Sequence, residues 1–175
     1  MPAGADAGLQ VHGIYASSAP VGPVAAPVRS SLPLGMQFGE RVAFVGNTLL
    51  DRAQDFGHLE TMLHQTMPEQ QLTFRHLAWS ADEVDLQPRP DNFATQLQHL
   101  THTKADIIVA AWGFNESFAG LDGLPSFKNR LRTWIETVSG RAFNGRSAAK
   151  VVLLSPPANE DVPGVAAGSR NNERL

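Results

Sequence analysis

Residues 41–50 read RVAFVGNTLL, and this stretch decides the fold. Its first five residues form a short apolar run that ends at Gly46, which is the pattern of a buried β-strand. Residues 51–65 follow with apolar side chains at helical spacing, so a helix is expected there. A strand that passes through a short loop into a helix indicates an α/β protein.

The same alternation continues along the chain. Apolar runs predict further strands at 71–77, 106–112 and 150–154, and helical spacing predicts helices at 92–102 and 127–138. The run at 106–112 is apolar without alternation, as in a parallel strand that is covered on both faces. The order β-α-β-α-β-α-β therefore predicts a parallel sheet with right-handed crossovers.

The regions outside this pattern have a different composition. Residues 1–37 are rich in Ala, Gly, Pro and Ser and show no periodicity, so we interpret them as a flexible leader. A short edge strand at 11–15 is an alternative for part of it. The domain is expected to span 38–160, and residues 161–175 form a short polar tail.

The composition bounds the function. The 175 residues suffice for one domain, and a hydrophobic content of 42% predicts a real core. A net charge of -3 argues against a nucleic-acid partner, and the absence of cysteine excludes thiolate chemistry. No apolar run approaches the roughly 20 residues of a membrane span. The first ten residues carry no positive charge, so no signal peptide is readable and the compartment stays unknown.

Three loops follow the predicted strands at 46–50, 78–83 and 113–120. Ligands of parallel sheets bind beyond the carboxyl ends of the strands, so these loops are the place to look for function. A hydroxyl at Thr48 would lie near a helix N-terminus, which favours developing negative charge. On local grounds, however, Thr48 or Asp51 is more simply a helix cap.

The second and third loops also have two interpretations each. Residues 78–83 could offer backbone N–H groups to an oxyanion, although Ser80 followed by Asp82 and Glu83 equally resembles the start of a helix. Gly113 permits a tight turn, and the amide of Asn115 can donate to an oxyanion. The glycosylation pattern at 115–117 is taken as chance.

No cofactor is predicted. No pair of histidines has metal-ligand spacing with carboxylate support, and no glycine-rich nucleotide turn is present. His58 stands out because Phe56-Gly57-His58 interrupts the first predicted helix.

Taken together, the three loops resemble the sequence blocks of the SGNH (GDSL-type) hydrolase superfamily. Residues 46–49 (Gly-Asn-Thr-Leu) stand where the family has Gly-Asp-Ser-Leu, residues 80–82 resemble Ser-Gly-Asp, and residues 113–116 resemble Gly-x-Asn-Asp. When the compared blocks are extended to residues 46–49, 56–58, 79–83 and 113–118, the sequence is similar to SGNH-like domains of planctomycete-type bacteria. Those domains are often parts of large exported proteins that also carry haem-binding modules.

The resemblance implies a three-layer α/β/α, flavodoxin-like sheet and hydrolysis of acyl or acetyl esters of carbohydrates or lipids. It implies that Thr48 takes the nucleophile position, with the Ala81 N–H and the Asn115 amide as oxyanion donors. The expected ligand is a small-molecule ester or glycan. The residues expected to contact it are Asn47, Trp79, Ser80, Gly113, Phe114 and Glu116.

The sequence departs from the family pattern in four places. Thr48 replaces serine, Asn47 replaces aspartate and Ala81 replaces glycine, and no Asp-x-x-His segment follows residue 105. The sheet is therefore expected to lack the C-terminal strand and the catalytic loop. A neutral hydroxyl without a base is a poor nucleophile. Three hypotheses stay open: a degenerate or truncated esterase, a non-catalytic module that binds a carbohydrate or acyl ligand through Asn47, Asn115, Trp79, Trp112 and Phe114, and an incomplete structural unit with an uncovered edge.

Overall fold

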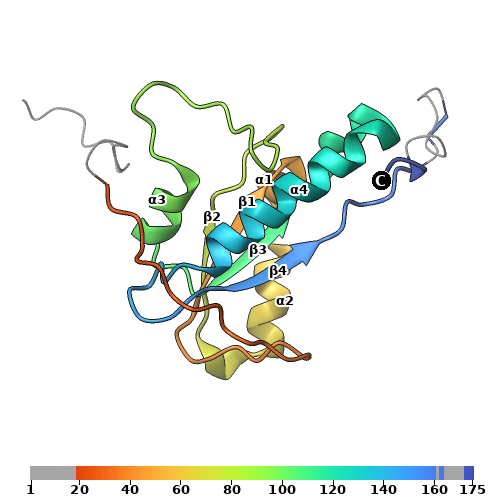
Figure 1. Ribbon diagram of the computed structural model, residues 1–175. Helices are drawn as coiled ribbons and strands as arrows, with labels where there is room; N and C mark the ends of the chain where they lie inside the picture. The colour runs from red at the N-terminus through yellow and green to blue at the C-terminus, as the bar shows by residue number, and fades with distance from the viewer. Residues whose placement is uncertain (1–18, 161, 164–171) are drawn as a thin grey trace, which may run out of the picture.

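The computed structural model describes residues 19–160, 162–163 and 172–175, and its centre is a four-stranded parallel sheet (Figure 1). The strands are β1 (Arg41–Gly46), β2 (Thr73–His76), β3 (Ile107–Ala111) and β4 (Lys150–Leu154), in the spatial order β2-β1-β3-β4. β1 pairs with β2 on one side and with β3 on the other, in the register Val42↔Phe74 and Val42↔Ile107. The predicted parallel sheet is confirmed.

Helices cover both faces of this sheet. The helices are α1 (Thr48–Ala53), α2 (His58–Thr66), α3 (Gln96–His102) and α4 (Gly120–Ser139), with short 3₁₀ turns η1 (Pro68–Gln70) and η2 (Glu116–Ala119). Ala43 and Val45 of β1 pack toward the α3 and α4 layer, whereas Val42 and Phe44 pack toward the α1 and α2 layer. This alternation gives the three-layer, flavodoxin-like architecture that was expected.

The prediction of one helix over 51–65 is wrong. The chain forms two helices instead, because Gly57 adopts a left-handed backbone (φ 62°) between α1 and α2. The interruption noted at residues 56–58 is therefore a true helix break. Two other helices differ from the predicted bounds. α3 begins at Gln96 and not at residue 92, because Thr95 and Gln98 form a capping box there. α4 begins at Gly120, seven residues before the expected position.

Part of the predicted leader contacts the domain. Residues 1–18, including the alternative edge strand at 11–15, lie outside the described residues, as does most of the 161–175 tail. Ala25 N–H donates to the Gly140 carbonyl (2.8 Å), and Val24 and Arg141 form an isolated antiparallel bridge. Lys150 Nζ donates to the Gly35 carbonyl (2.8 Å). These contacts hold the described portion of the leader against the domain.

Within the described ranges, no helix has the length and apolar content that crossing a membrane requires.

Candidate functional site

The three loops at the carboxyl ends of β1, β2 and β3 converge at one edge of the sheet. The backbone of Gly46 lies so close to β3 that an added Cβ would stand 2.2 Å from the Ala111 carbonyl oxygen. Trp79 N–H donates to the Gly46 carbonyl (3.0 Å), and Asn47 N–H donates to that of Ala111 (3.1 Å). Glycine at position 46 is thus a steric requirement for bringing these strand ends together.

Asn47 caps α1. Its side-chain Oδ1 accepts a hydrogen bond from Leu49 N–H (3.1 Å), and the residue is only 3% exposed. The expectation that Thr48 or Asp51 is the cap is therefore wrong, because both belong to the first turn of the helix. The capping role leaves the hydroxyl of Thr48 and the carboxylate of Asp51 available for contacts with the second loop.

The first turn of α1 holds two consecutive residues of the second loop. Thr48 Oγ1 accepts a hydrogen bond from Ala81 N–H at 3.2 Å. Asp51 Oδ2 accepts hydrogen bonds from Ser80 N–H (3.0 Å) and from the Ser80 hydroxyl (2.5 Å). No helix begins at Ser80, so the expectation of a helix start at 80–83 is wrong. The loop takes its shape from α1.

Ala81 has a left-handed backbone, with φ at +67°. Residues other than glycine rarely adopt this conformation, because Cβ then crowds the carbonyl oxygen. The glycine of the family block that Ala81 resembles would adopt it without strain. Ala81 therefore holds its N–H group in this direction at an energetic cost.

The third loop reaches the same place from β3. Asn115 Nδ2 donates to the carbonyl of Asp82, the residue after Ala81, at 3.2 Å. Thr48 and Asn115 therefore contact adjacent residues of one loop, although 67 positions separate them in the chain. The resemblance requires residues 48, 81 and 115 to lie close together, and they do. Their catalytic roles stay a prediction.

Glu116 joins the second and third loops. Its Oε1 accepts from Val84 N–H and its Oε2 accepts from Gly113 N–H, both at 2.9 Å, and the residue is 6% exposed. Gly113 itself is buried, with φ at +102° and Pro156 beside it. Glu116 and Gly113 thus shape the loop.

The aromatic residues expected to contact a ligand lie in different settings. Trp79 is 43% exposed, with the Arg89 guanidinium 4.0 Å from its ring centroid and the Phe93 ring stacked at 5.4 Å. Phe114 is half-buried against Phe118. Trp112 is buried, and its ring meets that of Trp134 edge to face at 5.7 Å. Of the three, Trp79 is the most accessible.

The connection from β2 to α3, residues 77–95, has no regular structure, but several contacts hold it in place. Asp82 is buried, and both of its carboxylate oxygens accept from the Arg89 guanidinium (2.8 and 2.5 Å). Arg130 of α4 pairs with Asp85 at 2.5 Å. The sequence did not predict these ion pairs, because pairs seven and 45 residues apart follow no local pattern.

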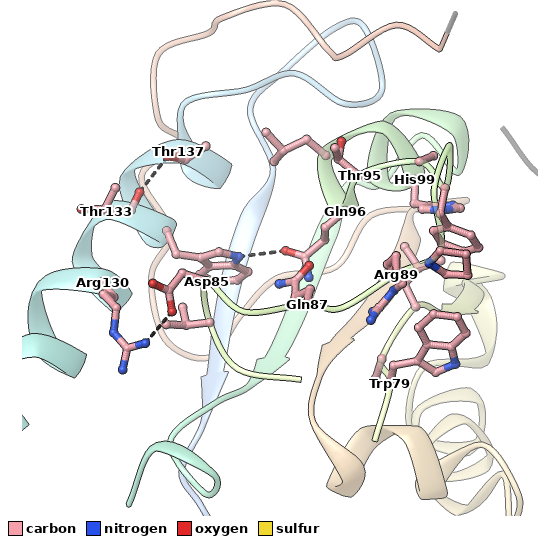
Figure 2. Close-up of a pocket in the computed structure, with 18 of the residues that line it drawn as sticks. Trp79, Asp85, Gln87, Arg89, Thr95, Gln96, His99, Arg130, Thr133 and Thr137 are labelled. Atoms are coloured by element: carbon pink, nitrogen blue, oxygen red, sulfur yellow. Dashed lines mark hydrogen bonds and ion pairs between the residues drawn. The ribbon is translucent and has the colours of Figure 1, made fainter. Parts of the chain in front are cut away.

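A cavity of about 1000 Å³ lies between this loop, α3 and α4 (Figure 2). A second cavity of about 360 Å³ lies beside the third loop, between the first half of α4 and the end of β4, and apolar side chains such as Phe127, Leu131 and Leu153 line much of it. Trp79 lines the first cavity, and Trp112 and Gly113 line the second. The strand-end loops thus have a hollow on either side.

In the part of the chain that the structure describes, no histidine is placed as a base for Thr48. Among the residues that the structure describes, Ala81 N–H is the hydrogen-bond partner of Thr48 Oγ1, and no histidine or carboxylate contacts that oxygen. His58 stacks on Phe56 at the start of α2. Burial lowers the pKa of His99 below its ordinary value, and His102 and Arg89 lower it further. In the described part of the chain, no group of three or more acidic or histidine side chains is arranged to hold a metal ion.

Comparison with solved structures identifies the class of fold. The chain is similar to a gut microbial diltiazem-metabolizing enzyme, with a TM-score of 0.54 and 14% sequence identity. The match covers 80% of this chain but only 33% of the enzyme, so the chain spans about a third of that protein's length. No protein-family model matches the chain, and no curated protein matches it either. The likeness concerns the α/β fold.

Proposed function

We propose that the domain is an SGNH-type hydrolase that cleaves acyl or acetyl esters, with Thr48 as the attacking residue. One observation carries the proposal: Thr48 Oγ1 lies 3.2 Å from the Ala81 N–H, and the Asn115 amide contacts the next residue of the same loop. Acyl transfer requires a hydroxyl with hydrogen-bond donors nearby, and here one backbone N–H contacts the hydroxyl while a second donor is held on the same loop. Of the ligand contacts expected from the sequence, Trp79, Ser80, Gly113, Phe114 and Glu116 remain in the proposal, whereas Asn47 is buried as the cap of α1.

The proposed reaction has two steps. Thr48 Oγ1 forms a bond to the ester carbonyl carbon while its proton passes to solvent hydroxide, and the carbonyl oxygen becomes an oxyanion that the Ala81 N–H and the Asn115 amide stabilise. The C–O bond to the alcohol then breaks, and the leaving oxygen takes a proton from water. Water hydrolyses the acyl-threonine and restores the hydroxyl.

The smaller cavity supports an acyl substrate. It lies beside Gly113 and Glu116 of the third loop, and its walls include Phe127, Leu131 and Leu153. Apolar walls with few polar groups suit a short hydrocarbon chain. The ester carbonyl of such a substrate would then lie on the side of Asn115.

The test compares release of p-nitrophenol from p-nitrophenyl acetate and butyrate by the wild type and four variants. Thr48→Ala should reduce the enzymatic rate to background, and Asn115→Ala should reduce it about tenfold to a hundredfold. Thr48→Ser should raise it, because the β-methyl group restricts χ1 and crowds the attack path. Thr61→Ala, an exposed threonine on α2, is the matched control and should behave as wild type. Equal rates for wild type and Thr48→Ala would remove Thr48 from the mechanism.

The pH profile gives a second test. With hydroxide as the base, the rate should rise about tenfold for each pH unit across the neutral range. A rate that instead levels off above pH 7 would indicate a histidine base that this proposal does not contain.

A non-catalytic binding module is the second candidate. The lack of a histidine or carboxylate partner for Thr48 Oγ1 among the described residues favours it. Ligand binding that survives Thr48→Ala, with no turnover by either protein, would select this function.

The narrower assignments are part of the proposal as well. Three of these assignments rest on the sequences of the three loops. They are the planctomycete-type branch, a degenerate active site, and a place beside haem-binding modules in exported relatives. The proposed domain boundaries remain 38–160, between the 1–37 leader and the 161–175 tail.

A further inference from the structure

The cavity between α3, α4 and the 77–95 loop is a built site apart from the proposed reacting groups, and Trp79 is the one expected ester contact on its lining. Its lining includes neither Thr48 nor Asn115. At about 1000 Å³ it matches the size of pockets that enclose drug-sized ligands. Figure 2 shows Thr133 and Thr137 of α4 on one wall and Gln96 and Gln87 facing them.

One wall is a row of uncharged polar side chains. Asn129, Thr133 and Thr137 recur every fourth residue of α4 and therefore share a face of that helix. The hydroxyls of Thr133 and Thr137 donate to carbonyls one turn earlier, at 3.1 and 2.8 Å. Their oxygens keep a lone pair that can accept a hydrogen bond from a ligand.

The facing wall offers amides. Gln96 Oε1 accepts from Trp134 Nε1 (2.8 Å), which fixes the amide and directs its NH₂ group away from the indole. Gln87 of the loop lines the same cavity. Amide NH₂ groups donate and hydroxyl oxygens accept, so the two walls offer complementary groups to a ligand rich in hydroxyls.

The arginines of the cavity are already neutralised by the protein. Arg130 pairs with Asp85 (2.5 Å) and Glu83 (3.6 Å), and Arg89 pairs with Asp82. An anionic ligand would have to compete with these carboxylates, and it would also meet Asp91 on the lining. The charges therefore favour a neutral ligand.

From these contacts we propose that the cavity binds a neutral oligosaccharide. Hydroxyl-rich rings match the amide and hydroxyl walls, and the apolar faces of a sugar match the floor formed by Val84, Leu97 and Trp134. This binding does not depend on hydrolysis at Thr48, so the two proposals succeed or fail separately.

The experiment is calorimetric titration of the full chain with cellotetraose, xylotetraose, mannotetraose and chitotetraose, and with tetragalacturonate as the anionic comparison. At least one neutral tetrasaccharide should bind, and tetragalacturonate should bind at least tenfold more weakly. Thr133→Val keeps the side-chain shape but removes the oxygen, so it should weaken binding about threefold to tenfold. Asn129→Ala should have a similar effect.

Thr61→Val is the matched control, because the Thr61 hydroxyl also donates to a carbonyl one turn earlier, on α2 outside the cavity. It should leave the affinity unchanged, and so should Thr48→Ala. No binding of any neutral tetrasaccharide at 10 mM would overturn the proposal, as would stronger binding of tetragalacturonate. Binding that Thr48→Ala abolishes and Thr133→Val leaves intact would place the saccharide at the strand-end loops and overturn it too.

Discussion

Asp51 and Ser80 are joined by two hydrogen bonds to a single carboxylate oxygen, one from the Ser80 backbone N–H and one from its hydroxyl. Asp51 lies one turn after Thr48 on α1, and Ser80 directly precedes Ala81. The same helical turn therefore fixes both the hydroxyl and the N–H group of the proposed site. Asp51 is a positioning residue for that site.

Replacing Asp51 should loosen the second loop. We expect Asp51→Ala to lower the free energy of unfolding by about 1 kcal/mol, because both bonds from Ser80 to the half-exposed carboxylate are lost. Hydrogen exchange at Ser80 and Ala81 should accelerate, and urea denaturation measures the stability. Asp55→Ala removes the same charge from an exposed position just beyond α1 and should leave both readouts unchanged. Equal effects of the two variants would mean that only charge matters.

The strain at Ala81 predicts a stabilising substitution. Ala81→Gly relieves a left-handed backbone that costs an alanine roughly 1–2 kcal/mol, although glycine also gains entropy in the unfolded chain. The expected net gain is up to about 1 kcal/mol in chemical denaturation. Gly57→Ala is the reverse comparison, since Gly57 has φ +62° and open space around it. This variant should lose about as much folding stability as Ala81→Gly gains. A loss of stability in Ala81→Gly would contradict the assigned conformation.

Arg89 should be the most costly residue to remove from the 77–95 loop. Arg89→Met leaves the carboxylate of Asp82, whose side chain is 2% exposed, without its partner, so we expect a loss of about 3 kcal/mol. Arg132→Met, at an exposed position of α4, is the control and should change stability little. Adding Asp82→Asn to Arg89→Met should restore part of the loss, because no buried charge is then unpaired. No recovery in the double variant would contradict this account.

The sequence was sufficient for the sheet and for the meeting of the three loops. Apolar runs mark β1 and β3 because burial on both faces leaves no room for polar residues. A similar run marks β4, although that edge strand is only partly buried. Parallel strands place their carboxyl ends at one edge, so residues 48, 81 and 115 had to come close once the order was read correctly.

The finer features depend on distant contacts that no local pattern reveals. Asn47 displaces Thr48 as the helix cap, and Glu116 turns inward because two backbone N–H groups converge on it from separate loops. The large cavity depends on the Asp82–Arg89 pair and on Arg130 reaching across from α4. Such a cavity can be identified only from the tertiary structure.

His99 should make the stability of the domain depend on pH. Its pKa in the folded protein is lowered, first by burial and then by His102 and Arg89, whereas in the unfolded chain it stays near the ordinary value of 6.5. As the pH falls through that value, the unfolded chain takes up a proton that the folded protein resists. Folding stability should therefore be fully present above about pH 7 and decline toward the folded-state pKa.

The measurement is urea denaturation of wild type and His99→Gln between pH 5 and 8, because glutamine cannot titrate. The decline below pH 7 should be smaller in the variant, and the difference between the two curves isolates the proton that His99 binds. Following the His99 ring protons by NMR gives the folded-state pKa directly. A midpoint at or above 6.5, or parallel stability curves, would show that the ring beside Phe93 is not sheltered from solvent in the way that its packing implies.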